Sequence, residues 1–242
     1  MCCIMIMTTK EMDKMCTSII SNRQKTIVGW NLDVLNMKYK VIEDKDKVFI
    51  AYYDKTVGYI PMFGANSRGD FITTPTCYPI EETRALDETH NIIRLNHDLL
   101  FQKKSLEELK EFVSTHVICS IPGIAFQSQL TDQKGNVLQV IPGQGYRYID
   151  RPKYAVMTNF SPIRGIKDDH PWMGVDRYQI ALKRLSEAKE DFDIKDCFEI
   201  LKEVSQTKCP TVISMVFDVS ERIVYWCENR EWQHIHKHDL GN

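Results

Sequence analysis

The sequence lacks several features that would indicate particular protein classes. Its 242 residues carry 31 basic and 33 acidic side chains, a formal net charge of −2, so nothing favours binding by phosphate neutralisation. No apolar run reaches the roughly 20 residues that a membrane-spanning helix needs. The apolar opening MCCIMIM is too short for a signal-peptide core, and no basic region precedes it. We therefore expect a cytoplasmic protein whose partners include neither nucleic acid nor membrane.

Internal repeats, low-complexity segments and Gly/Ser-rich linkers are also missing. The chain is 43% hydrophobic and 26% charged, as ordinary globular proteins are, which excludes a disordered, collagen-like or coiled-coil chain. Its length fits one large domain or two small ones and supports a substantial core. Without a linker to divide it, the chain is expected to form a single domain.

Cysteine is plentiful, but no C-x-x-C pair occurs, so neither a zinc finger nor a redox motif is indicated. In the cytosol these thiols are expected to stay reduced. The terminal HIHKH would place His234, His236 and His238 on one face of an extended segment. No cysteine or carboxylate cluster supports them, so a solvated tail is favoured over zinc, and no metal site is predicted. The eight cysteines are Cys2, Cys3, Cys16, Cys77, Cys119, Cys197, Cys209 and Cys227.

Hydrophobic periodicity predicts strands, helices, strands, helices and strands in that order. Short alternating bursts predict strands between residues 16 and 74, followed by a ragged helical segment at 90–102 and a helix that opens with the capping box of Ser105 and Glu108. Strands recur between 123 and 160, helices are predicted at about 175–189 and 194–205, and two strands close the chain. This order favours an α+β domain with two antiparallel sheets over alternating βαβ units.

Cys16 differs from the other cysteines because it directly follows Met15. If Met15 were a removed initiator, or if residues 1–15 were cut away, Cys16 would carry both a thiol and a free α-amine. An α-amine with a pKa of about 7.7–8.0 can act as the base for its own thiol. Taken alone, the Met15-Cys16 dipeptide favours an ordinary buried cysteine in a strand. The neighbouring residues therefore decide between this interpretation and a nucleophile.

Several short segments occur in the order found in one enzyme family. They are CTSII, GWNLD, GANSRGDF, LTDQKGNVLQVIP, YAVMTNFSP, VDRYQIALKRL and TVISMVFDVSERIVYW. Together they resemble the choloylglycine hydrolase family of N-terminal-nucleophile amidases, which includes bile salt hydrolases and penicillin V acylases. Each segment is degenerate, whereas the ordered set covers almost everything after Met15 and is much more specific.

The resemblance implies a four-layer αββα sandwich of two antiparallel sheets flanked by helices, the Ntn-hydrolase fold. It implies Cys16 as the nucleophile and Asp33 as the carboxylate beside its α-amine. Asn66 and Asn159 match the two asparagines that help to hold the oxyanion, as acyl transfer requires. Arg177 matches an arginine that supports the nucleophile electrostatically.

The sequence departs from the family pattern beside the nucleophile. Trp30 replaces the arginine of the G-R-N-x-D stretch, which removes a cation that would help to activate a thiol. Trp30 and Phe63 are candidates for the walls of a substrate pocket, although alternating aromatics are more often core residues. The predicted organisation is an extension or pro-segment over residues 1–15, which is removed, and an Ntn-hydrolase domain over 16–242.

We therefore expect a cysteine-nucleophile hydrolase of linear amide C–N bonds that forms a thioester acyl-enzyme and needs no cofactor. Its substrate would be a small amide such as an N-acyl amide, a penicillin V-like compound or a conjugated bile acid. Relatives imply a homo-oligomer. Two alternatives stay open: an acyltransferase of the acyl-CoA:6-aminopenicillanic acid type on the same fold, and a non-catalytic binding protein that retained the fold.

Overall fold

A computed structural model describes residues 14–55, 58–78, 90–120, 125–166 and 173–241. Its strands form two antiparallel sheets. The six-stranded sheet has the order β10 (Tyr154–Met157), β1 (Lys14–Asn22), β2 (Thr26–Val34), β11 (Thr211–Asp218), β12 (Ile223–Glu228) and β13 (His236–Asp239). The seven-stranded sheet runs in sequence order through β3 (Tyr39–Asp44), β4 (Lys47–Asp54), β5 (Gly58–Asn66), β6 (Phe71–Thr73), β7 (Ser128–Thr131), β8 (Val137–Ile141) and β9 (Gly145–Ile149).

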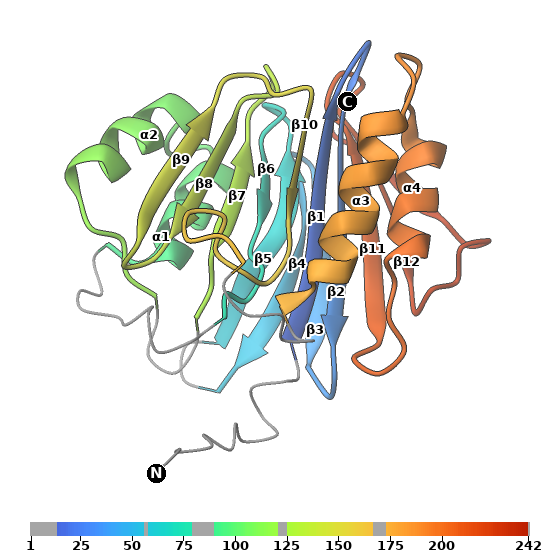
Figure 1. Ribbon diagram of the computed structural model, residues 1–242, viewed down its shortest axis with the longest axis horizontal. Coiled ribbons are helices and arrows are strands. Elements are labelled where there is room, and N and C mark those ends of the chain that lie inside the picture. Colours follow the sequence, from blue (N-terminus) through green and yellow to red (C-terminus); the bar gives the residue numbers. More distant parts are fainter. Residues whose placement is uncertain (1–13, 56–57, 79–89, 121–124, 167–172, 242) are drawn as a thin grey trace.

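Helices cover the outer face of each sheet, which makes four layers (Figure 1). The helices α1 (Ile92–Leu100) and α2 (Leu106–Thr115) lie on the seven-stranded sheet. On the other side, α3 (Val175–Glu187) and α4 (Ile194–Glu203) lie on the six-stranded sheet. The predicted αββα sandwich is therefore confirmed.

The largest apolar core lies between the two sheets, and a second core lies between the six-stranded sheet and its helices. Strand β1 contributes to both because successive side chains of a strand point to opposite faces. Cys16 and Ile20 belong to the core between the sheets, whereas Ile19 belongs to the core beneath α3 and α4. Strand β1 is therefore buried on both faces, and it also carries buried polar side chains such as Thr17, Ser18 and Ser21.

The predicted capping box is present at the start of α2, where Ser105 and Glu108 bond to each other's backbone amides. Two strands were not predicted from the sequence. Strand β3 has charged residues on its exposed positions and only half-buried apolar ones, so its hydrophobic alternation is weak. Strand β13 is formed by HKHD, which has no apolar residue, and it exists because β12 offers a free edge. Residues 236–239 are mostly exposed, as the predicted solvated tail implies, but they form a paired strand and not an irregular tail.

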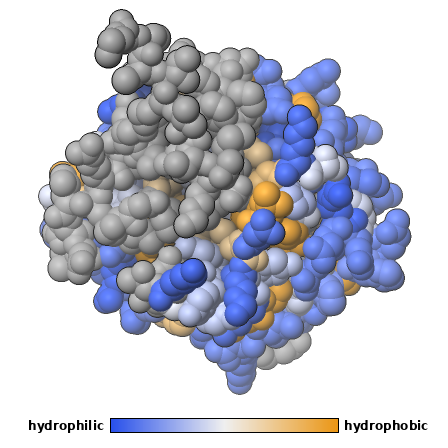
Figure 2. All heavy atoms as spheres, turned by 90° about the horizontal axis from the view of Figure 1, so that it is seen from below, coloured by the Kyte–Doolittle hydropathy of each residue, from blue (hydrophilic) through white to orange (hydrophobic). Residues whose placement is uncertain are grey.

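No helix among the described residues is long and apolar enough to cross a membrane. Among the described residues on the face seen from below, most are hydrophilic, and a group of hydrophobic side chains lies near the centre (Figure 2).

Candidate active site

Cys16 lies near the start of β1, where its side chain points into the space between the sheets. Its register partner on β2 is Leu32, and both side chains belong to the core between the sheets. The backbone N–H of Cys16 donates a hydrogen bond to Asn159 Oδ1 at 3.0 Å. The nitrogen that would become an α-amine is therefore already held by a polar side chain.

Asp33 lies at the end of β2, directly opposite Met15 in the β1–β2 register. Its side chain is completely buried, and both of its oxygens accept hydrogen bonds. Thr211 Oγ1 donates to Oδ1 at 2.6 Å, and Gln206 Nε2 donates to Oδ2 at 2.7 Å. Burial raises the pKa of Asp33, while the cation of Arg177 and these two donors act in the opposite direction.

Arg177, in the first turn of α3, connects the other polar groups of the site. Its Nη1 atom donates to the Cys16 carbonyl at 2.6 Å and to Thr17 Oγ1 at 2.7 Å, and lies 3.5 Å from Asp33 Oδ2. Its Nη2 atom donates to Asn159 Oδ1 at 2.9 Å. The guanidinium is buried, so this planar set of donors holds the backbone of Cys16 in one position.

Gly174 makes room for Arg177 at the start of α3. Its φ of +67° is a left-handed conformation that favours glycine. A Cβ atom at this position would collide with the Arg177 guanidinium, in particular with its Nη2 and Cζ atoms. The glycine is therefore required both by the backbone conformation and by the path of the arginine side chain.

Asn159 follows β10 and contacts Cys16 and Arg177 through a single oxygen. Its Oδ1 atom accepts from both residues, and its Nδ2 atom donates to the Thr76 carbonyl at 2.8 Å. The carbonyls on either side of Asn159, those of Thr158 and Phe160, accept from the buried amide of Gln127 at 2.8 and 3.2 Å. The Asn159 side chain is thus fixed from two directions.

The environment of the Cys16 thiol disfavours its ionisation to a thiolate. It is buried, and this burial raises its pKa well above the ordinary value of 9.0. The negative charge of Asp33 acts in the same direction, while Arg177 and the backbone amide of Asp33 oppose it. In the chain as it stands, with Met15 still attached, the thiol is neutral and the nitrogen is an amide.

Four of the five predicted catalytic residues, Cys16, Asp33, Asn159 and Arg177, come together in this cluster, but Asn66 does not. The Asn66 amide donates to Asp70 Oδ2 at 3.0 Å and to the carbonyls of Leu99 and Leu100 at the end of α1. Its oxygen accepts from the Asp70 amide. Asn66 therefore closes its own turn and caps α1, and the structure does not support it as an oxyanion donor.

Trp30 and Phe63, the predicted substrate-binding residues, are fully buried between the sheets, where their rings lie against each other. Both belong to the same apolar core as Cys16. They pack the two sheets together in this structure, and contact with a substrate stays a prediction. Trp30 supplies no charge, and the cation that contacts Cys16 in the described part of the chain is Arg177 of α3.

Each of the three C-terminal histidines contacts a different residue. His236 stacks on Trp226, His238 lies 3.1 Å from Glu43, and His234 lies 3.3 Å from Glu231. Within the described ranges, no group of three or more His, Cys, Asp or Glu side chains is arranged to hold a metal ion.

Sequence analysis missed the residues that hold Asp33 and Asn159. Gln206 and Thr211 lie 173 and 178 residues from Asp33 in the chain, and no spacing signal connects them to it. Gln127 lies 31 and 33 residues from the two carbonyls that accept from it, those of Thr158 and Phe160. The one signal that could have drawn attention to Gln127 is its place directly after the apolar Ile124, Ala125 and Phe126.

Comparisons with known proteins agree with this geometry at the level of the fold. No protein-family model matches the sequence, and no curated protein matches it significantly. Among solved structures, a mutant of the conjugated bile acid hydrolase from Clostridium perfringens matches with a TM-score of 0.65 and 14% identity over 94% of both chains. Penicillin V acylase from Agrobacterium tumefaciens matches with a TM-score of 0.65 and 12% identity, over 93% of this chain and 86% of the other.

An N-acylethanolamine-hydrolyzing acid amidase ortholog from Caenorhabditis elegans also matches, with a TM-score of 0.58 and 17% identity. The match covers 84% of this chain and 93% of that one. At these identities the likeness establishes the fold, which is the Ntn-hydrolase fold that the sequence landmarks predicted. The chemistry must therefore be argued from the residues themselves.

Proposed function

We propose that this protein is an amide hydrolase whose nucleophile is the Cys16 thiol, released for catalysis by cleavage between Met15 and Cys16. The observation that carries the proposal is the position of the Cys16 nitrogen, which donates to Asn159 beside Arg177 and Asp33. Cleavage turns this amide nitrogen into an α-amine without moving it away from its partners. The protein would then carry nucleophile and base on one residue.

The first half of the reaction forms a thioester. The Cys16 sulfur attacks the carbonyl carbon of the substrate amide while its own α-amine takes the thiol proton. The tetrahedral intermediate collapses, the C–N bond breaks, and the α-ammonium returns the proton to the leaving nitrogen. In the second half the α-amine takes a proton from water as the hydroxide attacks the thioester carbonyl. The C–S bond then breaks, the carboxylic acid departs, and the α-ammonium returns its proton to the Cys16 sulfur.

The surrounding residues have distinct roles in this scheme. Asp33 lies opposite the residue that precedes Cys16, where a carboxylate stabilises the protonated form of the α-amine. Arg177 holds the Cys16 carbonyl and the Asn159 oxygen, and so acts as a positioning residue. Asn159 accepts from the Cys16 nitrogen through Oδ1, and its Nδ2 group donates one hydrogen to the Thr76 carbonyl. Of the two asparagines predicted from the sequence we assign only Asn159 as an oxyanion donor, through the second Nδ2 hydrogen.

Removal of residues 1–15 supplies the step that activates the chain. While Met15 is attached, the Cys16 nitrogen is an amide without basicity, and burial holds the pKa of the thiol high. Removal would add a positive charge next to the sulfur and open the end of β1, and both changes lower the pKa of the thiol.

Intact-mass measurement together with Cys16→Ser tests the proposal. Active preparations should contain a chain that begins at Cys16, and hydrolysis of N-acyl amino acids, penicillin V, conjugated bile acids or acyl homoserine lactones should be lost in Cys16→Ser. Cys119→Ala, a change at another buried cysteine, is the matched control and should retain activity. Activity in a preparation that contains only the chain beginning at Met1 would contradict the mechanism.

An acyltransferase would form the same thioester and differ only in the second nucleophile. Adding a free amine to the assay separates the two reactions, because a transferase gives the new amide as its main product while a hydrolase gives the acid.

A further inference from the structure

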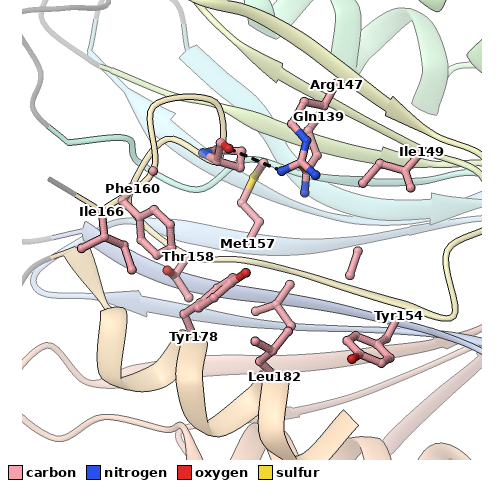
Figure 3. A pocket seen from close by; sticks show the side chains of 14 residues that line it. Gln139, Arg147, Ile149, Tyr154, Met157, Thr158, Phe160, Ile166, Tyr178 and Leu182 are labelled. Carbon is pink, nitrogen blue, oxygen red and sulfur yellow. Dashed lines mark hydrogen bonds between the residues drawn. The ribbon is translucent and has the colours of Figure 1, made fainter. Parts of the chain in front are cut away.

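A pocket of about 320 Å³ lies along the free edge of β10, outside the cluster around Cys16. Strands β8 and β9 of the seven-stranded sheet form one wall, and α3 forms the other (Figure 3). Neither Cys16, Asp33 nor Arg177 lines it. The pocket is within the size range of small-molecule sites.

One wall of the pocket presents a cation and a buried acceptor side by side. Gln139 on β8 and Arg147 on β9 are directly opposite each other in the strand register, so their side chains lie on the same face (Figure 3). Arg147 is exposed and donates to the Pro162 carbonyl at 3.4 Å. None of the described residues that line the pocket is acidic, so none of them neutralises the Arg147 charge.

Gln139 is only 2% exposed, and its oxygen Oε1 has no hydrogen-bond partner among the described residues. Its nitrogen is already used, because Nε2 donates to Gln129 Oε1 at 2.7 Å. Gln129 in turn donates to Ser18 Oγ at 2.9 Å, so the two amides form one chain of hydrogen bonds that ends on β1. A buried acceptor without a partner costs free energy, and a ligand that donates a hydrogen bond would remove that cost.

The opposite wall is apolar and aromatic. Tyr178 and Leu182 are one turn apart on α3, and Met157, Phe160 and Ile166 come from β10 and the segment after it. This wall suits a hydrocarbon tail or a ring.

We propose that this pocket binds an apolar carboxylate that carries an N–H or O–H donor beside the carboxylate group. The carboxylate pairs with Arg147, the neighbouring donor bonds to Gln139 Oε1, and the tail lies on the α3 wall. Cross-strand neighbours have Cβ atoms about 4.5–5.5 Å apart, a separation that matches a carboxylate and a donor on adjacent atoms of one small ligand. The site is separate from the Cys16 cluster and does not depend on the proposed hydrolysis.

Three probes that differ in one group each test the two polar contacts. N-octanoylglycine has the carboxylate, the N–H donor and the tail; N-octanoylglycinamide lacks the charge; N-octanoylsarcosine lacks the donor. Titration calorimetry on the full chain with Cys16→Ala prevents hydrolysis during the measurement. We expect N-octanoylglycine to bind, and each of the other two to bind about tenfold more weakly, the effect of losing one hydrogen bond to a charged or buried group.

Two variants assign the contacts to their residues. Arg147→Gln should weaken N-octanoylglycine about tenfold and leave N-octanoylglycinamide unchanged. Gln139→Met should weaken N-octanoylglycine and leave N-octanoylsarcosine unchanged; if this buried variant does not fold, the comparison of the two probes tests the same contact. Arg184→Gln, on the exposed face of α3 and outside the pocket, should alter none of the three values.

Equal affinity for the three probes, no binding of N-octanoylglycine, or an unchanged Kd in Arg147→Gln would overturn the proposal. These outcomes are distinguishable from a failure of the proposed function. Binding to Cys16→Ala together with no hydrolysis by the wild-type chain would remove only the function, and hydrolysis without binding at Arg147 would remove only this site.

Discussion

Two polar regions lie on either side of the segment Thr158–Phe160, and they differ in how their hydrogen-bonding groups are satisfied. Around Cys16, the Asp33 oxygens, the Asn159 amide and the Arg177 nitrogens Nη1 and Nη2 all have partners within the chain. In the pocket along β10, Gln139 Oε1 has no partner among the described residues and Arg147 has only a carbonyl. A closed network holds its own atoms in position, whereas unsatisfied groups indicate that a ligand completes them.

The difference also concerns burial. Arg177 is inside the protein and its removal leaves other polar groups unpaired, whereas Arg147 is exposed and its removal leaves a solvated surface. Removing an arginine should therefore cost much more unfolding free energy around Cys16 than in the pocket along β10.

Arg177→Met should have the largest effect. It leaves the Asp33 carboxylate buried without its cation, and the loss of one partner of a buried ion pair costs about 3–5 kcal/mol of unfolding free energy. Arg147→Gln should change that free energy by less than about 0.5 kcal/mol. Denaturant titration of both variants checks the comparison, which fails if the two losses are equal.

Gly174→Ala should come next. Gly174 and Gly165 both have positive φ, at +67° and +71°, but a Cβ at Gly165 meets open space while one at Gly174 meets the Arg177 guanidinium. Gly165→Ala should therefore lower the unfolding free energy only by the cost of a left-handed backbone conformation, about 1–2 kcal/mol. Gly174→Ala should lose an additional 1–3 kcal/mol or so from overpacking and also lower activity.

Thermal or denaturant unfolding of the two alanine variants measures both losses. The backbone strain is common to both, so the difference between the losses is the cost of displacing Arg177. Identical losses in the two alanine variants would mean that Arg177 moves aside without cost, and that its position is not closely held.

Thr211→Val should have a smaller effect on stability, about 1–3 kcal/mol for a buried acceptor that loses its donor. The lost hydrogen bond stabilised the charged carboxylate, so the pKa of Asp33 should rise further and the acidic limb of the pH–activity profile should move to higher pH. Thr207→Val, at an exposed position of the preceding turn, is the control. If the acidic limb stays in place or moves to lower pH, ionisation of Asp33 does not control the activity.

The smallest effect should appear in thiol labelling. Burial raises the pKa of Cys16 above 9.0, so its thiolate fraction keeps increasing beyond that pH, and iodoacetamide should label the chain beginning at Met1 slowly and ever faster up to strongly alkaline pH. In the chain beginning at Cys16, loss of residues 1–15 should open the end of β1 and expose the sulfur, and because less burial favours the thiolate, this profile should move down by about one pH unit or more. Peptide mass spectrometry measures both profiles.

Cys227 provides the internal reference for this measurement, because burial raises its pKa to about 11 and its surroundings do not include residue 15. Its profile should be the same in both forms of the chain. If the Cys16 profile were also unchanged, removal of residues 1–15 would not activate the thiol.

Local patterns predicted most of the fold, and the errors have a common cause. The strands and helices with strong periodicity were predicted, and the capping box of α2 formed as expected. Strand β13 was missed because HKHD has no hydrophobic signal, and only the free edge of β12 makes it a strand. The expected cytoplasmic location and homo-oligomeric assembly stay predictions.

For the site, the ordered landmarks pointed to four residues that the structure brings together and to one, Asn66, that it does not. Asn66 was chosen because its turn resembled a family motif, but a turn motif says nothing about what the asparagine side chain contacts. Its amide is used within the turn and at the end of α1.

By itself the sequence determined which segments become strands and helices, because periodicity and capping act over a few neighbouring residues. It also singled out Cys16 by its place after Met15. Only the tertiary structure decided which polar groups meet, since Asp33, Asn159 and Arg177 reach Cys16 from separate elements across as many as 161 residues of chain. The structure likewise decided which groups lack partners: the unpaired oxygen of Gln139 depends on the packing of two sheets and a helix, which no local pattern encodes.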